Sequence, residues 1–133
     1  MLLHTIMSSL ILLVDDDPTL LEALSETVRL RMDAVVETAA SSPEALDRIS
    51  AIDYDAIVSD VKMPHMDGLT LMRRVRAIRP TTPTILMTAH GDPELAVHAL
   101  HVGAYAFIEK PIDRDGFIAS LERAVAGRHA EPT

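Results

Sequence analysis

The chain has 133 residues, of which 48% are hydrophobic and 24% charged, and it contains no cysteine. Disulfide frameworks, cysteine-based zinc sites and thiol nucleophiles are therefore excluded. The net charge of −8 argues against a surface that binds duplex nucleic acid, because such surfaces are usually basic. No apolar run reaches the roughly 18 residues of a membrane span, and the apolar stretch before Asp15 has no basic leader. We expect a cytoplasmic domain that binds neither nucleic acid nor membrane.

Short apolar runs alternate along the chain with segments of helical periodicity. The runs predict strands at 10–14, 34–36, 56–58, 84–87 and 104–108. Apolar stripes at helical spacing fall between or after them: Leu20, Leu21, Leu24 and Val28; Leu69, Met72, Val75 and Ile78; and Phe117, Ile118, Leu121 and Val125. Strands that alternate with helices indicate βαβ units and a parallel sheet.

Capping residues next to prolines mark the helix starts. Asp17-Pro18, Ser42-Pro43 and Asp92-Pro93 each open a predicted helix, and Gly103 is placed to end the fourth one. Five βα units are too few for a barrel but suit a small doubly wound α/β sheet. We expect an N-terminal extension over 1–8, a single domain over 9–127, and a flexible tail or linker start over 128–133.

Three consecutive carboxylates follow the first predicted strand. Asp17 has an ordinary use as the cap of the next helix. Asp15 and Asp16 have no such use, and adjacent like charges are costly to bury unpaired. A divalent cation would explain the pair, because hard cations take carboxylate oxygens as ligands.

Polar residues also follow three of the other strands. Asp60 follows the third, Thr88 the fourth and Lys110 the fifth. Each residue also has an ordinary explanation. Asp60 could cap a loop, the Thr88 hydroxyl could bond its own backbone, and Lys110 could be a solvated charge. The carboxyl ends of parallel strands nevertheless meet at one edge, where open α/β sheets bind ligands. Carboxylates with Mg²⁺, an ammonium and a hydroxyl are suited to positioning and neutralising a phosphoryl group during transfer.

These residues resemble the response regulator receiver domains of bacterial two-component signalling. The matching motifs are "LLVDDD", "SDVKMPHMDG", "TAHGD" and "GAYAFIEKP", which occur in the family's order over about residues 9–127. The stretch 88–113 is most similar to receivers of the nitrogen-regulation type and to some attached to sensor kinases. The resemblance implies a flavodoxin-like (βα)5 fold of three layers with strand order 2-1-3-4-5.

By position, the resemblance implies that Asp60 is the phosphoacceptor. Asp15, Asp16, Asp60 and the backbone carbonyl of Lys62 would hold Mg²⁺ or Mn²⁺. Lys110 would pair with the phosphoryl group. Such a domain catalyses only its own phosphorylation and dephosphorylation, and is not a conventional turnover enzyme.

The resemblance also implies a switch. Thr88 would move toward the phosphoryl oxygens and Phe107 would follow it inward, although Tyr105 could take that part on chemistry alone. A phosphoryl group adds roughly −1.5 to −2 charge at this site. A group of side chains with two stable packing arrangements could transmit this local change to the surface. The family usually has a cis bond before the proline of its Lys-Pro pair, here Lys110-Pro111.

Partners follow from the same resemblance. The phosphodonor would be a histidine kinase or phosphotransfer protein. The fourth helix, fifth strand and fifth helix would signal to an output domain or protein partner, or form a homodimer. Lys62 and His90 would border the phosphoryl group, and we expect them to tune its lifetime unless both point to solvent.

One alternative belongs to another functional class. Asp15, Asp17 and Thr19 fit the Asp-x-Asp-x-Thr motif of haloacid-dehalogenase-type phosphohydrolases. Asp15 would then be the nucleophile of a true enzyme and Asp17 its acid/base. This interpretation leaves Asp60 and "KMPHMDG" unexplained, and the chain lacks room for a substrate cap.

Overall fold

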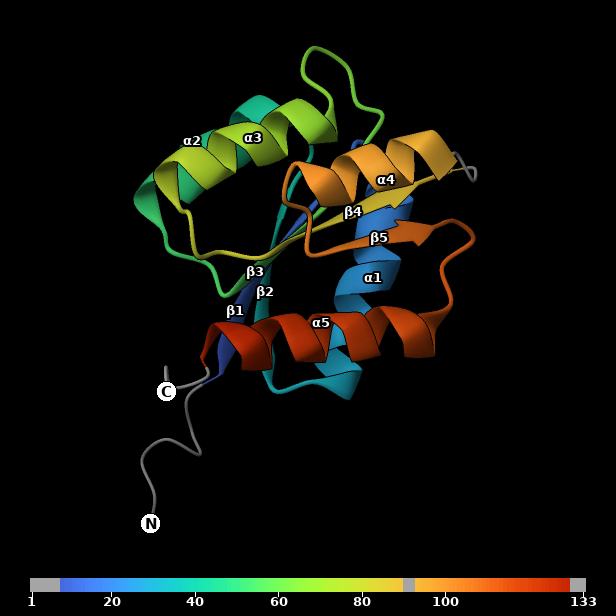
Figure 1. Cartoon of the computed structure of the whole chain (residues 1–133). Coiled ribbons are helices and arrows are strands. Elements are labelled where there is room, and N and C mark those ends of the chain that lie inside the picture. Colours follow the sequence, from blue (N-terminus) through green and yellow to red (C-terminus); the bar gives the residue numbers. More distant parts are fainter. Residues whose placement is uncertain (1–7, 90–92, 130–133) are drawn as a thin grey trace.

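The strands form one parallel sheet in the order β2-β1-β3-β4-β5 (Figure 1), which confirms the predicted topology. The computed structural model describes residues 8–89 and 93–129. The strands are β1 (Ser9–Val14), β2 (Ala34–Ala39), β3 (Ala56–Asp60), β4 (Thr84–Thr88) and β5 (Ala106–Glu109). The helices are α1 (Pro18–Arg31), α2 (Ser42–Ala51), α3 (Gly68–Ile78), α4 (Pro93–His101) and α5 (Arg114–Arg128).

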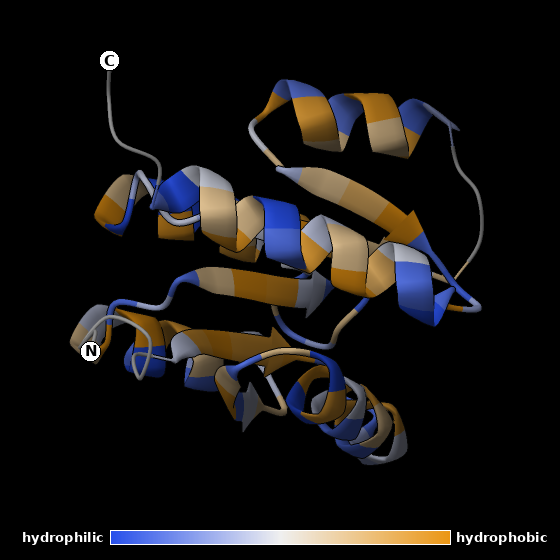
Figure 2. Cartoon of the chain, turned by 90° about the horizontal axis from the view of Figure 1, so that it is seen from below, coloured by the Kyte–Doolittle hydropathy of each residue, from blue (hydrophilic) through white to orange (hydrophobic). Residues whose placement is uncertain are grey.

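Helices cover both faces of the sheet, which gives the chain three layers. Ile11 and Leu13 of β1 pack in the cluster beneath α1 and α5, while Leu12 and Val14 pack in the cluster beneath α2 and α3. Alternate side chains of one strand thus enter opposite cores. This explains the uninterrupted apolar run of β1, and Figure 2 shows the hydrophobic strands between the helices.

Three local details differ from the sequence prediction. Ser41, not Ser42, caps α2: its side chain accepts from the Glu44 amide at 3.2 Å, while Ser42 lies inside the helix. Ile78 ends α3 with 47% of its surface exposed, so it does not join the buried stripe. The fifth strand begins at Ala106, because the chain is still leaving α4 at Gly103, where φ is +117°.

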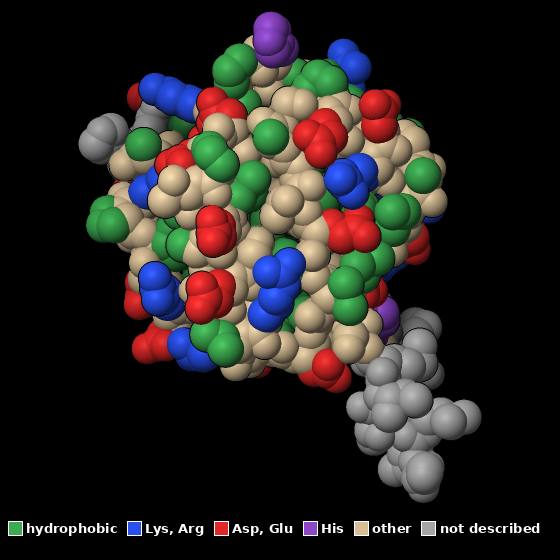
Figure 3. All heavy atoms as spheres, turned by 180° about the vertical axis from the view of Figure 1, so that it is seen from behind, with side chains coloured by type: hydrophobic (Ala, Val, Ile, Leu, Met, Phe, Trp, Pro, Cys, Tyr) green, Lys and Arg blue, Asp and Glu red, His purple; other side chains and the backbone are tan. Residues whose placement is uncertain are grey.

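The other caps follow the prediction where the structure describes them. The side chain of Asp17 accepts from the amides of Thr19 and Leu20 at the start of α1. Asp92 lies outside the described residues, as do most of the predicted extension and tail. Among the residues described, no helix is long and apolar enough to cross a membrane. On the face seen in Figure 3, acidic and basic side chains are interspersed.

Candidate functional site

The carboxyl ends of β1 and β3 bring two acidic segments together. Val14 pairs with Ser59, so the residues that follow them, Asp15 and Asp60, are neighbours across the sheet. Asp16 comes next along the chain. One carboxylate oxygen from each of these three aspartates lies within 4.8 Å of the others. Sequence segments 45 residues apart, from Asp15 to Asp60, therefore form one acidic cluster.

Two members of the acidic cluster are buried and share one cation. Asp15 is 1% exposed and Asp60 is 7% exposed, whereas Asp16 faces solvent. The ammonium of Lys110 lies 3.4 Å from Asp15 Oδ2 and 3.3 Å from Asp60 Oδ1. The backbone amide of Asp17 donates to Asp15 Oδ1 at 2.9 Å. One ammonium among three carboxylates leaves the cluster with a net negative charge.

Burial and like charges make the acidic cluster hard to ionise. Burial raises the pKa of Asp15, and the charge of Asp60 raises it further. Burial also raises the pKa of Asp60, with a further contribution from Asp16, against the lowering effect of Lys110. The pKa of Lys110 is lowered by burial, but the two aspartates outweigh this and raise it overall. The protein alone therefore does not balance this charge.

Thr88 lies between the strands that carry the acceptor and the lysine. It is the last residue of β4, which runs between β3 and β5, and its side chain is buried. The Lys110 amide donates to the Thr88 carbonyl at 2.7 Å, so the two residues are held side by side. The Lys110–Pro111 peptide bond is cis. Thr88 and Lys110 thus reach the edge of the sheet that carries Asp15 and Asp60.

The donor set fits a hard divalent cation. Mg²⁺ prefers carboxylate and carbonyl oxygens, and it commonly shares its coordination with phosphate oxygens. Burial is the main cause of the raised pKa of Asp15 and Asp60, and repulsion adds to it. A cation held by Asp15, Asp16 and Asp60 would relieve that repulsion. The backbone carbonyl of Lys62 follows Asp60 by two residues and would be the remaining protein ligand.

The two aromatic candidates for the switch occupy different surroundings. Phe107 is half-buried on β5, whereas Tyr105 precedes the strand and is 43% exposed. Phe107 packs against the cluster formed by Val61, Met72, Leu86, Ala99 and Ala104. This cluster joins α3, β4 and α4, so Phe107 is the aromatic placed to link the site to α4.

The structure describes one of the two candidates for tuning the phosphoryl lifetime. The Lys62 side chain is exposed, and His90 lies outside the described residues. His65, in the same loop as Lys62, has a positive φ of 71°. Such a conformation is uncommon for a residue other than glycine.

Gly68 is a site residue to which the sequence pattern assigned no role. A Cβ at this position would lie 2.1 Å from the carbonyl oxygen of Asp60 and 3.0 Å from the Cα of Val61. The Gly68 amide also donates to the Val61 carbonyl at 2.8 Å. The start of α3 therefore rests directly on the acceptor's backbone. The sequence Asp67-Gly68 at the start of this helix predicts a helix cap, but it does not predict the contact with Asp60.

The chain matches the model of the response regulator receiver domain over residues 11–122. It is 43% identical to the C4-dicarboxylate transport transcriptional regulatory protein DctD of Rhizobium meliloti (strain 1021) over 114 residues, or 86% of this chain and 25% of DctD. It is 36% identical to the DNA-binding transcriptional regulator NtrC of Klebsiella pneumoniae over 114 residues, or 86% of this chain and 24% of NtrC. The chain thus spans about a quarter of the length of these curated relatives.

Solved structures agree with the sequence match. A CheY-like receiver domain protein from Methanospirillum hungatei JF-1 has a TM-score of 0.86 at 27% identity, covering 92% of this chain and 97% of that one. The signal receiver domain of an HD domain-containing protein from Pseudomonas fluorescens Pf-5 has a TM-score of 0.87 at 28% identity, covering 94% of this chain and 100% of that one. The phosphohydrolase alternative is not favoured. The chain belongs to the response regulator receiver domain family, with relatives of the NtrC type.

Proposed function

We propose that Asp60 takes a phosphoryl group from a phosphohistidine on a kinase or phosphotransfer protein, in the cytoplasm. The observation that supports this is the position of Asp60: it is buried, 3.3 Å from the Lys110 ammonium, and grouped with the carboxylates of Asp15 and Asp16. An Asp60 oxygen attacks phosphorus as the donor's N–P bond breaks, and the departing imidazole takes up a proton. The domain itself turns over no external substrate.

The surrounding residues share the charge of the transferred group. Lys110, already 3.4 Å from Asp15 and 3.3 Å from Asp60, pairs with a phosphoryl oxygen, and the Thr88 hydroxyl donates to another. Mg²⁺ or Mn²⁺ held by Asp15, Asp16, Asp60 and the Lys62 carbonyl supplies the remaining neutralisation when bound. The movement of Thr88 opens space that Phe107 fills, and this repacks the cluster beneath α4.

The donor has an apolar place to dock next to the site. A pocket of about 350 Å³ opens beside Lys110, between α1 and the segment that follows β5. Its apolar lining residues are Leu20, Ala23, Leu24, Pro111 and Ile112. A donor protein that fills this pocket brings its phosphohistidine toward the edge where Asp60 lies.

The output face is the other partner surface in this proposal. On α4 and just before β5, Val97, Leu100 and Tyr105 are 68%, 49% and 43% exposed. Phosphorylation changes the packing of α4 and β5 beneath these side chains. An output domain, a protein partner or a second copy then binds the α4-β5-α5 face.

Intact mass after incubation with acetyl phosphate and Mg²⁺ tests the acceptor. We expect one phosphoryl group on the wild type and on Asp47→Asn, a matched change on α2 away from the acidic cluster. Neither Asp60→Asn nor the EDTA-treated wild type should gain it. Steady phosphate release that survives Asp60→Asn and is abolished by Asp15→Asn would contradict the proposal and support the phosphohydrolase.

The phosphoryl lifetime is tested with the same assay. Lys62→Ala and His90→Ala should each change the rate at which the adduct decays, because both residues border the group in this proposal. Unchanged decay in both variants would show that the two side chains only face solvent. Light scattering of the phosphorylated and unphosphorylated protein then tests the homodimer.

A further inference from the structure

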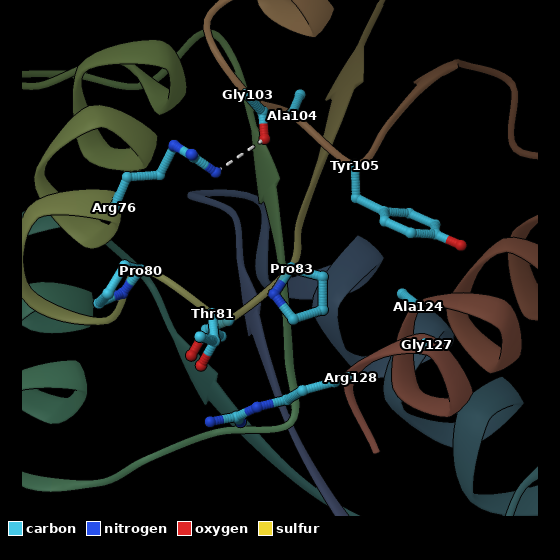
Figure 4. Close-up of a pocket in the computed structure, with 11 residues that line it drawn as sticks. Arg76, Pro80, Thr81, Pro83, Gly103, Ala104, Tyr105, Ala124, Gly127 and Arg128 are labelled. Atoms are coloured by element: carbon cyan, nitrogen blue, oxygen red, sulfur yellow. Dashed lines mark hydrogen bonds between the residues drawn. The ribbon is translucent and has the colours of Figure 1, made fainter. Parts of the chain in front are cut away.

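A second pocket lies at the opposite end of the sheet from Asp60. It encloses about 520 Å³ at the amino ends of β4 and β5, between the end of α3 and the end of α5. We call it the amino-end pocket; among the residues that line it are Arg76, Pro80, Thr81, Pro83, Gly103 and Tyr105 (Figure 4). It shares no residue with the acidic cluster, so phosphoryl chemistry does not explain it.

The amino-end pocket is cationic within an acidic protein. Its lining contains Arg76 and Arg128 but no aspartate or glutamate, although the chain carries a net charge of −8. Arg128 is already paired, since it contacts both carboxylate oxygens of Asp53 at 2.8 Å. Arg76 is exposed, and its guanidinium donates a long hydrogen bond of 3.5 Å to the Gly103 carbonyl. Arg76 therefore supplies the charge available to a ligand.

The Arg76 side chain lies directly against a glycine. A Cβ at Gly103 would lie 2.6 to 2.8 Å from three atoms of the Arg76 side chain, Nε, Cδ and Cζ. Gly103 also has a φ of +117°, which side-chain-bearing residues rarely adopt. The guanidinium thus lies against the bare backbone of Gly103, and Figure 4 shows it directed at that carbonyl.

The rest of the amino-end pocket combines apolar side chains with Thr81 and Thr82. Pro83 lies between Arg76 and Tyr105 in Figure 4, with Ala104 above it. The Tyr105 ring is 43% exposed at one side of the pocket. A planar apolar group can cover Pro83 and Ala104, while an attached anion reaches Arg76. Guanidinium groups recognise carboxylates through paired hydrogen bonds.

We propose that the amino-end pocket binds a carboxylate carried on a small planar apolar group, with Arg76 holding the carboxylate. A free aromatic acid and an aromatic residue at the C-terminus of a peptide both present this chemistry. The pocket is present in the unphosphorylated chain, so binding does not require phosphorylation.

An NMR titration of the uniformly ¹⁵N-labelled protein tests this proposal, with benzoate as the probe and benzamide as its uncharged equivalent. We expect benzoate to shift the amides of 103–105 and 81–82, and benzamide to bind about tenfold more weakly. Arg76→Gln should weaken benzoate by a similar factor. Arg74→Gln removes the same charge from an exposed site of the same helix outside the pocket, and should leave the affinity unchanged.

Titrations with further ligands identify the source of the carboxylate. The tripeptide Gly-Gly-Phe with a free carboxylate, compared with its C-terminal amide, tests for the C-terminus of a peptide. If the free tripeptide binds more tightly than benzoate, the ligand is a peptide. If benzoate binds more tightly, the ligand is a small aromatic acid. Equal binding of benzoate and benzamide, or equal losses in Arg76→Gln and Arg74→Gln, would overturn the proposal. Asp60→Asn should bind benzoate like the wild type.

Discussion

The two ends of the sheet use charge in opposite ways. At the carboxyl end, Asp15 and Asp60 share one lysine beside the third carboxylate of Asp16, and burial raises the pKa of Asp15 and Asp60. At the amino end, Arg128 contacts Asp53 at 2.8 Å and Asp55 at 3.7 Å, and the Arg128 hydrogen bond lowers the pKa of Asp53. The amino end therefore pairs its carboxylates with a cation, while the carboxyl end has more carboxylates than cations.

This difference distinguishes the amino-end ion pairs, which stabilise the fold, from the acidic cluster, which the proposed function uses. The amino-end pairs join the last turn of α5 to the loop between α2 and β3, and His129 extends them with a 2.8 Å contact to Asp55. Asp55 in turn accepts from the Leu10 amide of β1 at 2.7 Å. The carboxyl end instead places three carboxylates near one ammonium, so its carboxylates repel one another. In the proposed function, a bound cation would relieve this repulsion.

Two glycines give the largest expected contrast between the ends. Gly68→Ala places a methyl group 2.1 Å from the Asp60 carbonyl, and backbone must shift to admit it. We expect a loss of about 3 kcal/mol in the free energy of unfolding, together with slower phosphorylation by acetyl phosphate. Gly127→Ala meets no atom within 4 Å, and should gain about 0.5 kcal/mol through helix propensity.

Urea unfolding of both glycine variants measures this contrast. Equal stability of Gly68→Ala and the wild type would show that α3 can move away from the acceptor without cost. A large loss in Gly127→Ala would show that the end of α5 has no room for an added methyl group.

The matched charges of the amino end are tested with Arg128→Gln. The Arg128 side chain is only 13% exposed, and its loss removes a donor from the Tyr54 carbonyl and leaves Asp53 with the long 3.5 Å bond from the Thr82 hydroxyl. Water screens Asp53, which is 52% exposed, so we expect a loss of about 1.5 kcal/mol. Arg123→Gln, an exposed change on the same helix, should cost less than about 0.5 kcal/mol.

The pH dependence of the Arg128 effect has a definite sign. The pKa of Asp53 is lowered in the folded state, so its stabilisation is present above the unfolded value of 3.8 and disappears as the pH falls through the folded pKa. The difference between wild type and Arg128→Gln should therefore shrink in acid. A difference that grows below the unfolded pKa of 3.8 would contradict this assignment.

The sequence predicts these two ends unequally. Asp15, Asp60 and Lys110 could be placed together, because each lies at the end of a strand and parallel strands end at one edge. The pairing of Arg128 with Asp53 spans 75 residues and depends on where α5 ends in space, which no local pattern encodes. The same holds for Gly68, whose contact with the Asp60 carbonyl exists only after α3 packs.

Local ambiguity explains the smaller differences. Ser41 and Ser42 are adjacent and chemically equivalent, so a capping pattern cannot choose between them. The choice follows from tertiary contact: the Ser42 hydroxyl donates to the Met66 carbonyl at 2.7 Å, and Ser41 is left to cap α2.

Asp60→Asn should stabilise the metal-free protein. The folded pKa of Asp60 is raised, so the folded state binds more protons than the unfolded state from the unfolded pKa up to the folded one, and stability falls as the pH rises through that window. This cost is fully present once the pH is above the folded pKa. Removing the charge should recover about 1 kcal/mol in EDTA and flatten the acid limb of the stability profile. Asp47→Asn, on α2 away from the cluster, should change neither the stability in EDTA nor the acid limb. A loss of stability in Asp60→Asn would mean that Lys110 already balances the carboxylates.

Backbone strain gives the smallest contrast, and it also separates the two ends. At the amino end, the positive φ of 117° is occupied by Gly103, which adopts it without steric cost. At the carboxyl end, a φ of 71° is occupied by His65. Asparagine tolerates this left-handed region better than other side-chain-bearing residues. We expect His65→Asn to gain about 0.5 kcal/mol in urea unfolding, and His65→Ala, which keeps the strained geometry, to gain nothing. Equal gains in both variants would show that the histidine side chain, and not its backbone conformation, carries the cost.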